Sequence, residues 1–337
     1  MAEREADSLL FQPCLGWKGV FVLALGNTEK YSVQQMIMDK KSKKSNRLNV
    51  EKIIPGLLLL TAIISVLTTL GIVFTLIFET FTFFDRVSLK EFFTAQKWYP
   101  FSETSASYGI MPLISGTLKV TGIAALVAVP IGLATAIYLS EYASEKTRRI
   151  IKPILEVLAG IPTIVYGFFA LTFVTPILRS FIPSLEIFNA LSPGIVVGIM
   201  ITPMIASLSE DAMSSVPNSI KEGAFALGAT KLETAIKVIL PAAISGIMAS
   251  IVLALSRAIG ETMIVSVAGG STPNLSTDVT SSIQTMTAYI VQVSTGDAGY
   301  GTTIYYSIYA VGMMLFLFTL AMNLFAQFIS RKFREEY

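Results

Sequence analysis

Long apolar runs alternate with short charged segments along most of the chain. A membrane-spanning helix needs about 20 mostly apolar residues. Six runs approach this length, at about residues 53–78, 113–139, 153–178, 190–208, 244–268 and 303–329. The pattern therefore predicts an all-α membrane protein with six transmembrane helices.

Two residues inside the third run, Gly160 and Pro162, disturb its helical pattern. Proline removes a backbone hydrogen bond from a helix and can kink it. We treat these two residues as candidate hinges for gating, with a static kink as the plainer alternative.

Lys and Arg gather on one side of the predicted helices. They cluster before the first run, between the second and third, between the fourth and fifth, and after the sixth. Since cytoplasmic loops of membrane proteins carry the excess of Lys and Arg, both termini are expected in the cytoplasm.

The first 37 residues break this pattern. They begin with "MAEREADSLL", which is acidic, whereas a secretory signal begins basic. We expect either a disordered extension or translation that begins at Met36 or Met38. The next segments are a basic stretch with the first helix and an external loop (38–110), a core of five helices (111–331) and a cytoplasmic tail (332–337).

The composition narrows the chemistry that the chain can perform. It is 53% hydrophobic and only 14% charged, with a mean hydropathy of +0.66, whereas soluble domains carry about 25% charged residues. Histidine is absent and Cys14 is the lone cysteine, which excludes histidine relays, Ser-His-Asp triads and internal disulfides. The chain has no P-loop sequence. We therefore expect a non-enzymatic protein with no metal, cofactor or nucleic-acid partner.

The loop between the fourth and fifth runs, residues 217–241, is too polar for the membrane but carries signals of two short helices. The pairs with capping-box spacing are Ser219 with Glu222 and Thr230 with Glu233. Gly228 lies between them, where a left-handed residue can close the first helix, and Pro217 could instead be its first residue. Such a hairpin could dock into another protein or lie on the lipid headgroups.

This hairpin resembles the EAA loop of bacterial ABC importer permeases. The family pattern is E-A-A, three residues, G, nine residues and I-x-L-P. The matching residues here are Glu222-Gly223-Ala224, Gly228 and Val238-Ile239-Leu240-Pro241, with Gly223 and Val238 as mild departures. The resemblance implies a type I ABC importer permease (MetI-like) architecture. It also implies that Glu222, Gly223, Ala224 and Gly228 contact a separate ATPase subunit.

Two charges interrupt the fifth run. Arg257 and Glu261 are four residues apart, which would place them on one face of a shared helix. Because a charge at the membrane centre costs about 2.5–3.5 kcal/mol, that face is expected to point into protein or water. The pair could simply lock the helix against its neighbours. Alternatively, the pair lines a path for an anion. Arg257 then presents a planar fork of donors, Glu261 weakens the attraction of Arg257 for the anion, and Thr262 adds a hydroxyl.

Three motifs resemble those of the phosphate-specific ABC importers. They are "RAIGETM" (257–263), "GIPTIVYG" (160–167) and "YGIMPLISGTLKVT" (108–121). The resemblance covers about residues 51–331 and is closer to the C-type permease than to its A-type partner. It implies transport of inorganic phosphate across the bacterial cytoplasmic membrane. The implied partners are an A-type permease, two copies of an ATP-binding subunit, an extracytoplasmic phosphate-binding protein and membrane lipid.

The sequence leaves alternative functions open, as well as the roles of residues predicted to lie on the external side. The chain could be a permease for sulfate, molybdate or tungstate, an ion-driven secondary carrier, or a membrane scaffold or receptor. Lys119 departs from the family pattern and is expected to snorkel outward. Residues 86–108, with Trp98 and Tyr99, suggest a solvated loop with an interfacial aromatic anchor, or a contact for a docking partner. Residues 271–287 could face an arriving binding protein.

Overall fold

The computed structural model describes residues 33–332, apart from 103–104 and 297. It divides into two units, residues 1–72 and 73–337, which we describe separately. The first unit holds most of helix α2 (Val33–Phe84), whose side chains from Ile54 to Ile72 are almost all exposed. The predicted extension, residues 1–37, lies outside the described residues except for the first turn of α2.

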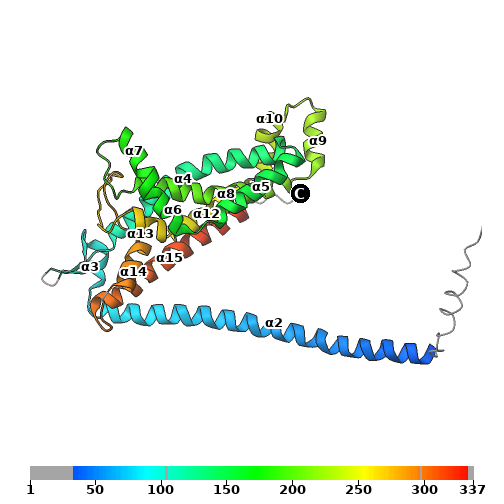
Figure 1. Cartoon of the computed structure of the whole chain (residues 1–337), viewed down its shortest axis with the longest axis horizontal. Helices are drawn as coiled ribbons and strands as arrows, with labels where there is room; N and C mark the ends of the chain where they lie inside the picture. The colour runs from blue at the N-terminus through cyan, green and yellow to red at the C-terminus, as the bar shows by residue number, and fades with distance from the viewer. Residues whose placement is uncertain (1–32, 103–104, 297, 333–337) are drawn as a thin grey trace, which may run out of the picture. The chain divides into compact units, whose positions relative to one another are not determined.

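The second unit is helical apart from one small hairpin, and its helices are labelled in Figure 1. The helices are α3 (Leu89–Thr94), α4 (Met111–Ile137), α5 (Glu145–Gly160), α6 (Thr163–Phe169), α7 (Thr175–Phe181), α8 (Leu191–Ser214), α9 (Asn218–Ala226), α10 (Lys231–Thr234), α11 (Leu240–Ala242), α12 (Ile244–Ile259), α13 (Met263–Ala268), α14 (Met286–Thr295) and α15 (Thr303–Lys332). Three π-helical segments continue the helices before them: η1 (Tyr138–Tyr142), η2 (Ala170–Val174) and η3 (Ala235–Ile239). Strands β1 (Trp98–Tyr99) and β2 (Ser107–Tyr108) pair antiparallel.

Five helical segments among the described residues are long and apolar enough to cross a membrane. They are Ile54–Phe84, Met111–Tyr142, Thr163–Phe181, Leu191–Ser214 and Thr303–Phe328. A sixth exists if Lys231–Ala242 and Ile244–Ile259 form one span, which is bent by 73°. The predicted all-α membrane protein is thus confirmed. The bend precedes the fifth predicted run, residues 244–268, which is itself interrupted between α12 and α13.

The third predicted run is also broken, at the position of its candidate hinges. Helix α5 ends at Gly160, and α6 begins after Pro162, whose ψ of 134° is extended. The hydroxyl of Tyr166 donates to the carbonyl of Leu158 across this break, at 2.8 Å. Gly160 and Pro162 therefore lie at a junction between two helices, and our expectation that they sit inside one continuous span was wrong. Their role as a hinge stays a prediction.

Helices α4 and α8 form the centre of the second unit, together with α12. Their backbones approach closely because glycines face large side chains across the contact. A Cβ atom at Gly132 of α4 would lie 2.8 Å from Ile205, and one at Gly198 of α8 would lie 2.8 Å from Val127. This close packing gives α12 a fixed support, since α12 packs on α8.

A second core lies under the loop that follows α2. Trp98 is only 1% exposed and packs edge-to-face against Phe92, Tyr108 and Tyr289, with ring centroids 4.9–6.4 Å apart. The interfacial anchor that we expected at Trp98 is therefore wrong, because the β1–β2 hairpin folds this ring into the protein. Tyr99 remains exposed at 53%.

Candidate functional site

The predicted charge pair, Arg257 and Glu261, lies at a break in the fifth span. Helix α12 ends at Ile259, Gly260 caps it, and α13 begins at Met263. Arg257 is in the last turn of α12, while Glu261 and Thr262 lie between the two helices. The prediction that Arg257 and Glu261 share one helix is therefore wrong.

The Glu261 carboxylate is directed to the backbone. Its Oε1 accepts hydrogen bonds from the N–H groups of Met263 and Ile264, at 3.1 and 3.2 Å. The residue is only 8% exposed, and its carbonyl accepts a hydrogen bond from the hydroxyl of Thr287 at 2.8 Å. Glu261 thus satisfies donors in the first turn of α13 that would otherwise be orphaned. The Thr262 hydroxyl donates to the carbonyl of Gly260 at 3.1 Å.

Arg257 is placed differently, because its side chain is exposed. In the part of the chain that the structure describes, its guanidinium makes no hydrogen bond or ion pair, including none with Glu261. A free planar fork of donors at the end of a span is suited to binding an oxyanion bidentately.

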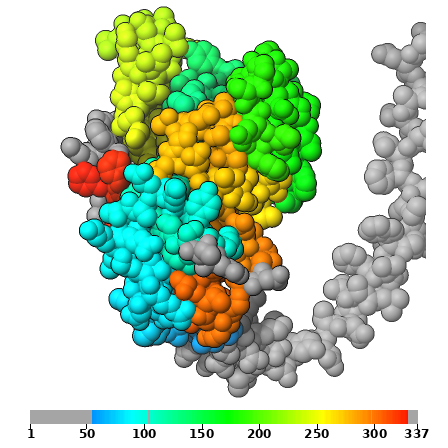
Figure 2. All heavy atoms as spheres, turned by 90° about the vertical axis from the view of Figure 1, so that its left-hand side faces the viewer, coloured from blue at the N-terminus to red at the C-terminus, as the bar shows by residue number. Residues whose placement is uncertain are grey.

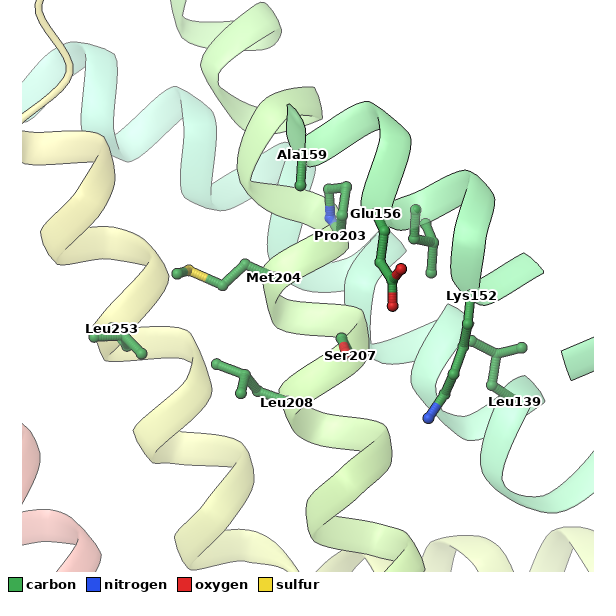
Figure 3. Close-up of a pocket in the computed structure, with 10 residues that line it drawn as sticks. Leu139, Lys152, Glu156, Ala159, Pro203, Met204, Ser207, Leu208 and Leu253 are labelled. Carbon is green, nitrogen blue, oxygen red and sulfur yellow. The ribbon is translucent and has the colours of Figure 1, made fainter. Parts of the chain in front are cut away.

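A cavity of about 390 Å³ is lined mainly by residues of α5 and α8, and Leu253 of α12 also contributes to its lining. Figure 3 shows its lining, with Met204 and Leu208 of α8 directed toward Leu253 of α12, and Lys152 and Glu156 projecting from α5. Leu253 precedes Arg257 by one helical turn, so both lie on the same face of α12. The cavity and the free guanidinium therefore share one face of the fifth span.

The 217–241 loop forms the expected helical hairpin, which projects at the top of the molecule in Figure 2 in yellow-green. The capping box between Thr230 and Glu233 is confirmed, since each backbone N–H donates to the other residue's side chain. The predicted box at Ser219 is wrong: α9 begins at Asn218, so Ser219 lies inside it. Pro217 occupies the N-cap position of α9 and is not its first helical residue.

The residues assigned to an ATPase contact surround the tip of this hairpin. Glu222, Gly223 and Gly228 are exposed, and Ala224 is half-buried. Leu227, next to Gly228, is 92% exposed. Phe225 and Leu232 of the same hairpin are also exposed, at 43% and 56%, and exposed apolar side chains that gather in one place mark interaction sites.

Gly228 has a φ of +85°, as the hairpin pattern predicted. We expect Gly228→Ala to destabilise the hairpin by roughly 1–2 kcal/mol, because a left-handed conformation is costly for a residue with a Cβ atom. Gly223→Ala is the matched control, since this glycine lies inside α9 with open space around it and alanine favours helix. Hydrogen exchange of the hairpin amides measures both effects. Equal exchange in the two variants would contradict the prediction.

The hydrogen bonds of Glu261 lead to a second prediction. Glu261→Ala leaves two backbone N–H groups without their acceptor, which we expect to cost about 1–3 kcal/mol of stability. Glu261→Gln keeps a carbonyl oxygen and should cost much less. Thermal unfolding of the purified protein in detergent distinguishes them. If Glu261 served instead as the counter-charge of Arg257, Gln and Ala would be equally damaging.

A buried charge cluster was missed by the sequence analysis. Glu210 of α8 is 1% exposed, and its carboxylate pairs with Lys152 and, at 3.6 Å, with Arg148. The hydrogen bond to Glu210 raises the pKa of the Lys152 ammonium. Nearby, Lys221 of α9 pairs with Glu141 of η1 at 2.7 Å. The available signal was the pair of adjacent carboxylates, Glu210 and Asp211, directly after the fourth apolar run, together with the basic segment between the second and third runs.

Lys119 also differs from expectation. Its Nζ atom is buried and has no hydrogen-bond partner among the described residues, so the prediction that it snorkels outward was wrong. The exposed Asp278 is close enough to interact with it electrostatically. A hydrogen bond from the backbone N–H of Thr280, at 2.8 Å, lowers the pKa of Asp278 and so keeps it charged.

Known transport proteins are similar to this chain in sequence. Residues 128–335 match the family model described as "Binding-protein-dependent transport system inner membrane component". The chain is 32% identical over 311 residues to a probable ABC transporter permease protein, YqgH, of Bacillus subtilis, covering 91% of this chain and 99% of that protein. It is 33% identical over 257 residues to the phosphate transport system permease protein PstC of Mesorhizobium japonicum, covering 71% and 77%.

Solved structures share the fold at low sequence identity. The bacterial alginate ABC transporter, in complex with an alginate pentasaccharide-bound periplasmic protein, matches with a TM-score of 0.56 at 18% identity, covering 88% of this chain and 98% of that chain. The inward-facing MetNI methionine ABC transporter matches with a TM-score of 0.52 at 18% identity, covering 67% and 98%. These matches confirm the MetI-like architecture.

Proposed function

Because the chain belongs to the family of binding-protein-dependent transport system inner membrane components, we propose that it is the C-type permease of a phosphate importer. Members of this family are multi-pass transport subunits of the inner membrane, not enzymes. Phosphate as the cargo is supported by the relatives named PstC and by the motifs at residues 108–121, 160–167 and 257–263.

The observation that carries the proposal is the state of Arg257. Its guanidinium is exposed and has no partner in the described part of the chain, and it lies in the last turn of α12, one turn after Leu253, which lines the cavity. A charge held free in a membrane span is costly and marks a substrate path by default. Phosphate, a tetrahedral oxyanion, suits a planar guanidinium fork. A site that passes its cargo onward must bind it without holding it too tightly.

We propose the remaining parts of the importer as well. An extracytoplasmic binding protein delivers phosphate, an A-type permease forms the other half of the pathway, and two ATPase subunits clamp the hairpins of both permeases. Their ATP cycle alternates the pathway between the two membrane faces. Both termini of this chain are then cytoplasmic, in agreement with its Lys and Arg distribution. The fully exposed Leu227 supports the assignment of the hairpin tip to ATPase docking.

Reconstitution of the chain with its neighbouring subunits in proteoliposomes tests this function. We expect ATP-dependent uptake of radiolabelled phosphate that requires the binding protein and is not displaced by excess sulfate, molybdate or tungstate. Displacement by one of these anions would reassign the cargo. Uptake driven by an ion gradient without ATP would favour a secondary carrier instead.

A further inference from the structure

We propose that the ion pair between Lys221 and Glu141 transmits the movement of the 217–241 hairpin to the cytoplasmic end of the second span. The proposal rests on the function above, in which that hairpin docks to the ATPase. Lys221 is on α9, within the hairpin, and Glu141 is in η1, the last turn of the span Met111–Tyr142. Docking and transmission are thus assigned to different residues of one short helix.

The geometry of the pair is tight. Lys221 Nζ lies 2.7 Å from Glu141 Oε1, and the two side chains are only 15% and 11% exposed. The hydroxyl of Ser140 donates to the same oxygen at 2.8 Å, which fixes the carboxylate. Exposed ion pairs are weak because solvent screens them and their side chains lose entropy on pairing. Because this pair is largely buried and its carboxylate accepts a second hydrogen bond, it can keep α9 and η1 together when α9 moves.

In the part of the chain that the structure describes, Lys221 is also the single polar link from α9 to the spans. Within the described residues, no other side chain of α9 makes a hydrogen bond or an ion pair. The other attachment of this helix is apolar, through Ile220, which packs against the cluster that contains Met213, Val216 and Ile239. Apolar contacts are non-directional, whereas the ion pair joins one point of α9 to one point of η1.

On the far side of this pair, η1 is tied to two further helices. The guanidinium of Arg148 on α5 donates to the carbonyl of Leu139, at 3.2 Å from Nε and 2.7 Å from Nη2, and to that of Ser140 at 3.3 Å. Arg148 Nε also lies 3.6 Å from Glu210 of α8. A displacement of α9 therefore reaches η1 through Lys221, and reaches α5 and α8 through Arg148. Helices α5 and α8 line the cavity to which Leu253 of α12 also contributes.

The π-helical form of η1 fits this role. Single turns of π-helix inside α-helices interrupt the regular hydrogen-bond ladder and occur frequently at functional sites. Here the segment ends the span directly at the point where Lys221 attaches. The end of the second span can thus shift without unwinding the α-helical part above it.

The experiment uses the full importer in proteoliposomes, with phosphate as cargo. Three variants are compared: Lys221→Met, Glu141→Gln, and the charge-swapped double variant Lys221→Glu/Glu141→Lys. We measure ATPase subunits retained on purification, ATP hydrolysis, and phosphate taken up per ATP hydrolysed. Each single variant should keep its ATPase subunits and its hydrolysis but lose about tenfold in phosphate per ATP. The double variant should recover most of that loss.

A matched control is available on α5. Glu145 and Arg149 form an ion pair at 3.7 Å, but their side chains are 87% and 83% exposed and link only successive turns of one helix. Glu145→Gln and Arg149→Met should leave phosphate per ATP unchanged.

Four outcomes would overturn the proposal, and a fifth would reject the proposed function. An unchanged phosphate-to-ATP ratio in the single variants overturns the proposal. Loss of the ATPase subunits from those variants would show that the pair positions the hairpin for docking. Loss of folded protein on size-exclusion chromatography would show that the pair is structural. Either result overturns the proposal that the pair transmits movement. No recovery in a folded, assembled double variant does the same. Failure of the parent importer to take up phosphate would instead reject the proposed function, so the two ideas fail separately.

Discussion

Arg257→Met is expected to abolish ATP-driven phosphate uptake while leaving the protein folded and its ATPase subunits bound. Hydrogen bonds to charged groups contribute roughly 1.5–3 kcal/mol each. Losing a bidentate pair therefore corresponds to a loss of about 100-fold or more in uptake. The fold should survive, because Arg257 is exposed and no described residue depends on it as a partner.

The conservative variant separates charge from shape. Arg257→Lys keeps the positive charge but loses the planar fork of donors. We expect it to retain more uptake than Met but to remain well below the parent. Initial rates of radiolabelled phosphate uptake across a range of phosphate concentrations measure the difference, and the weakening should appear mainly in the concentration at half-maximal rate.

A suitable control for Arg257 is Arg179, in the last turn of α7. It is likewise exposed and without a partner among the described side chains, but it lies at the end of the third span, Thr163–Phe181, and not at the break in the fifth span. Arg179→Met should leave uptake within about twofold, since surface substitutions of this kind are close to neutral. Normal uptake in Arg257→Met would reject the substrate role of that residue, and the family assignment would then depend on the matched sequence and the hairpin.

The parts of the fold that the sequence predicts well depend on local chemistry. A run of apolar residues identifies a span because the bilayer core admits little else. The hairpin was predicted because a left-handed Gly228 and a Thr230–Glu233 capping box are decided by neighbouring residues. Ser219 has the same spacing with Glu222, but the helix starts earlier at Asn218, after the proline. The Ser219–Glu222 spacing and Pro217 predict different first residues for this helix, and the sequence pattern alone does not show which of them applies.

The helix breaks were not predictable from hydropathy, because hydropathy reports the solvent of a segment and not the continuity of its backbone. Gly260 and Pro162 both lie in apolar runs that are long enough for one span. Each break instead depends on tertiary partners: Glu261 accepts from the first turn of α13, and Tyr166 spans the gap after α5. The four-residue spacing of Arg257 and Glu261 was therefore misleading about their pairing.

The polar contacts were missed for a related reason. The Lys and Arg cluster between the second and third runs, which includes Lys152 and Arg148, was used only as a marker of the cytoplasmic side. Both residues in fact pair with Glu210 on another helix. Trp98 was taken for an interfacial anchor because the β1–β2 hairpin that buries it is only two residues long on each strand. Contacts between distant segments require the packed structure, and a charge count along the sequence cannot supply them.

The cluster around Glu210 should be the most sensitive point for stability in the second unit. Glu210→Gln removes the one carboxylate that faces both Arg148 and Lys152, and the Glu210 side chain is only 2% exposed. Breaking a fully buried ion pair costs about 3–5 kcal/mol. Both cations keep about a third of their side chains exposed and can rehydrate in part, so we expect a loss of about 2–3 kcal/mol.

Thermal unfolding of the detergent-solubilised protein measures this loss, and Asp211→Asn is the matched control. Asp211 is the next residue on α8 and contacts the same Lys152 at 3.5 Å, but its side chain is 62% exposed. Because an exposed ion pair contributes little, this variant should lose no more than about 1 kcal/mol. Adding Lys152→Met to Glu210→Gln should cost less than the sum of the single changes, since the lysine has already lost its main partner. Equal destabilisation by Glu210→Gln and Asp211→Asn would show that burial of Glu210 adds nothing to the cluster.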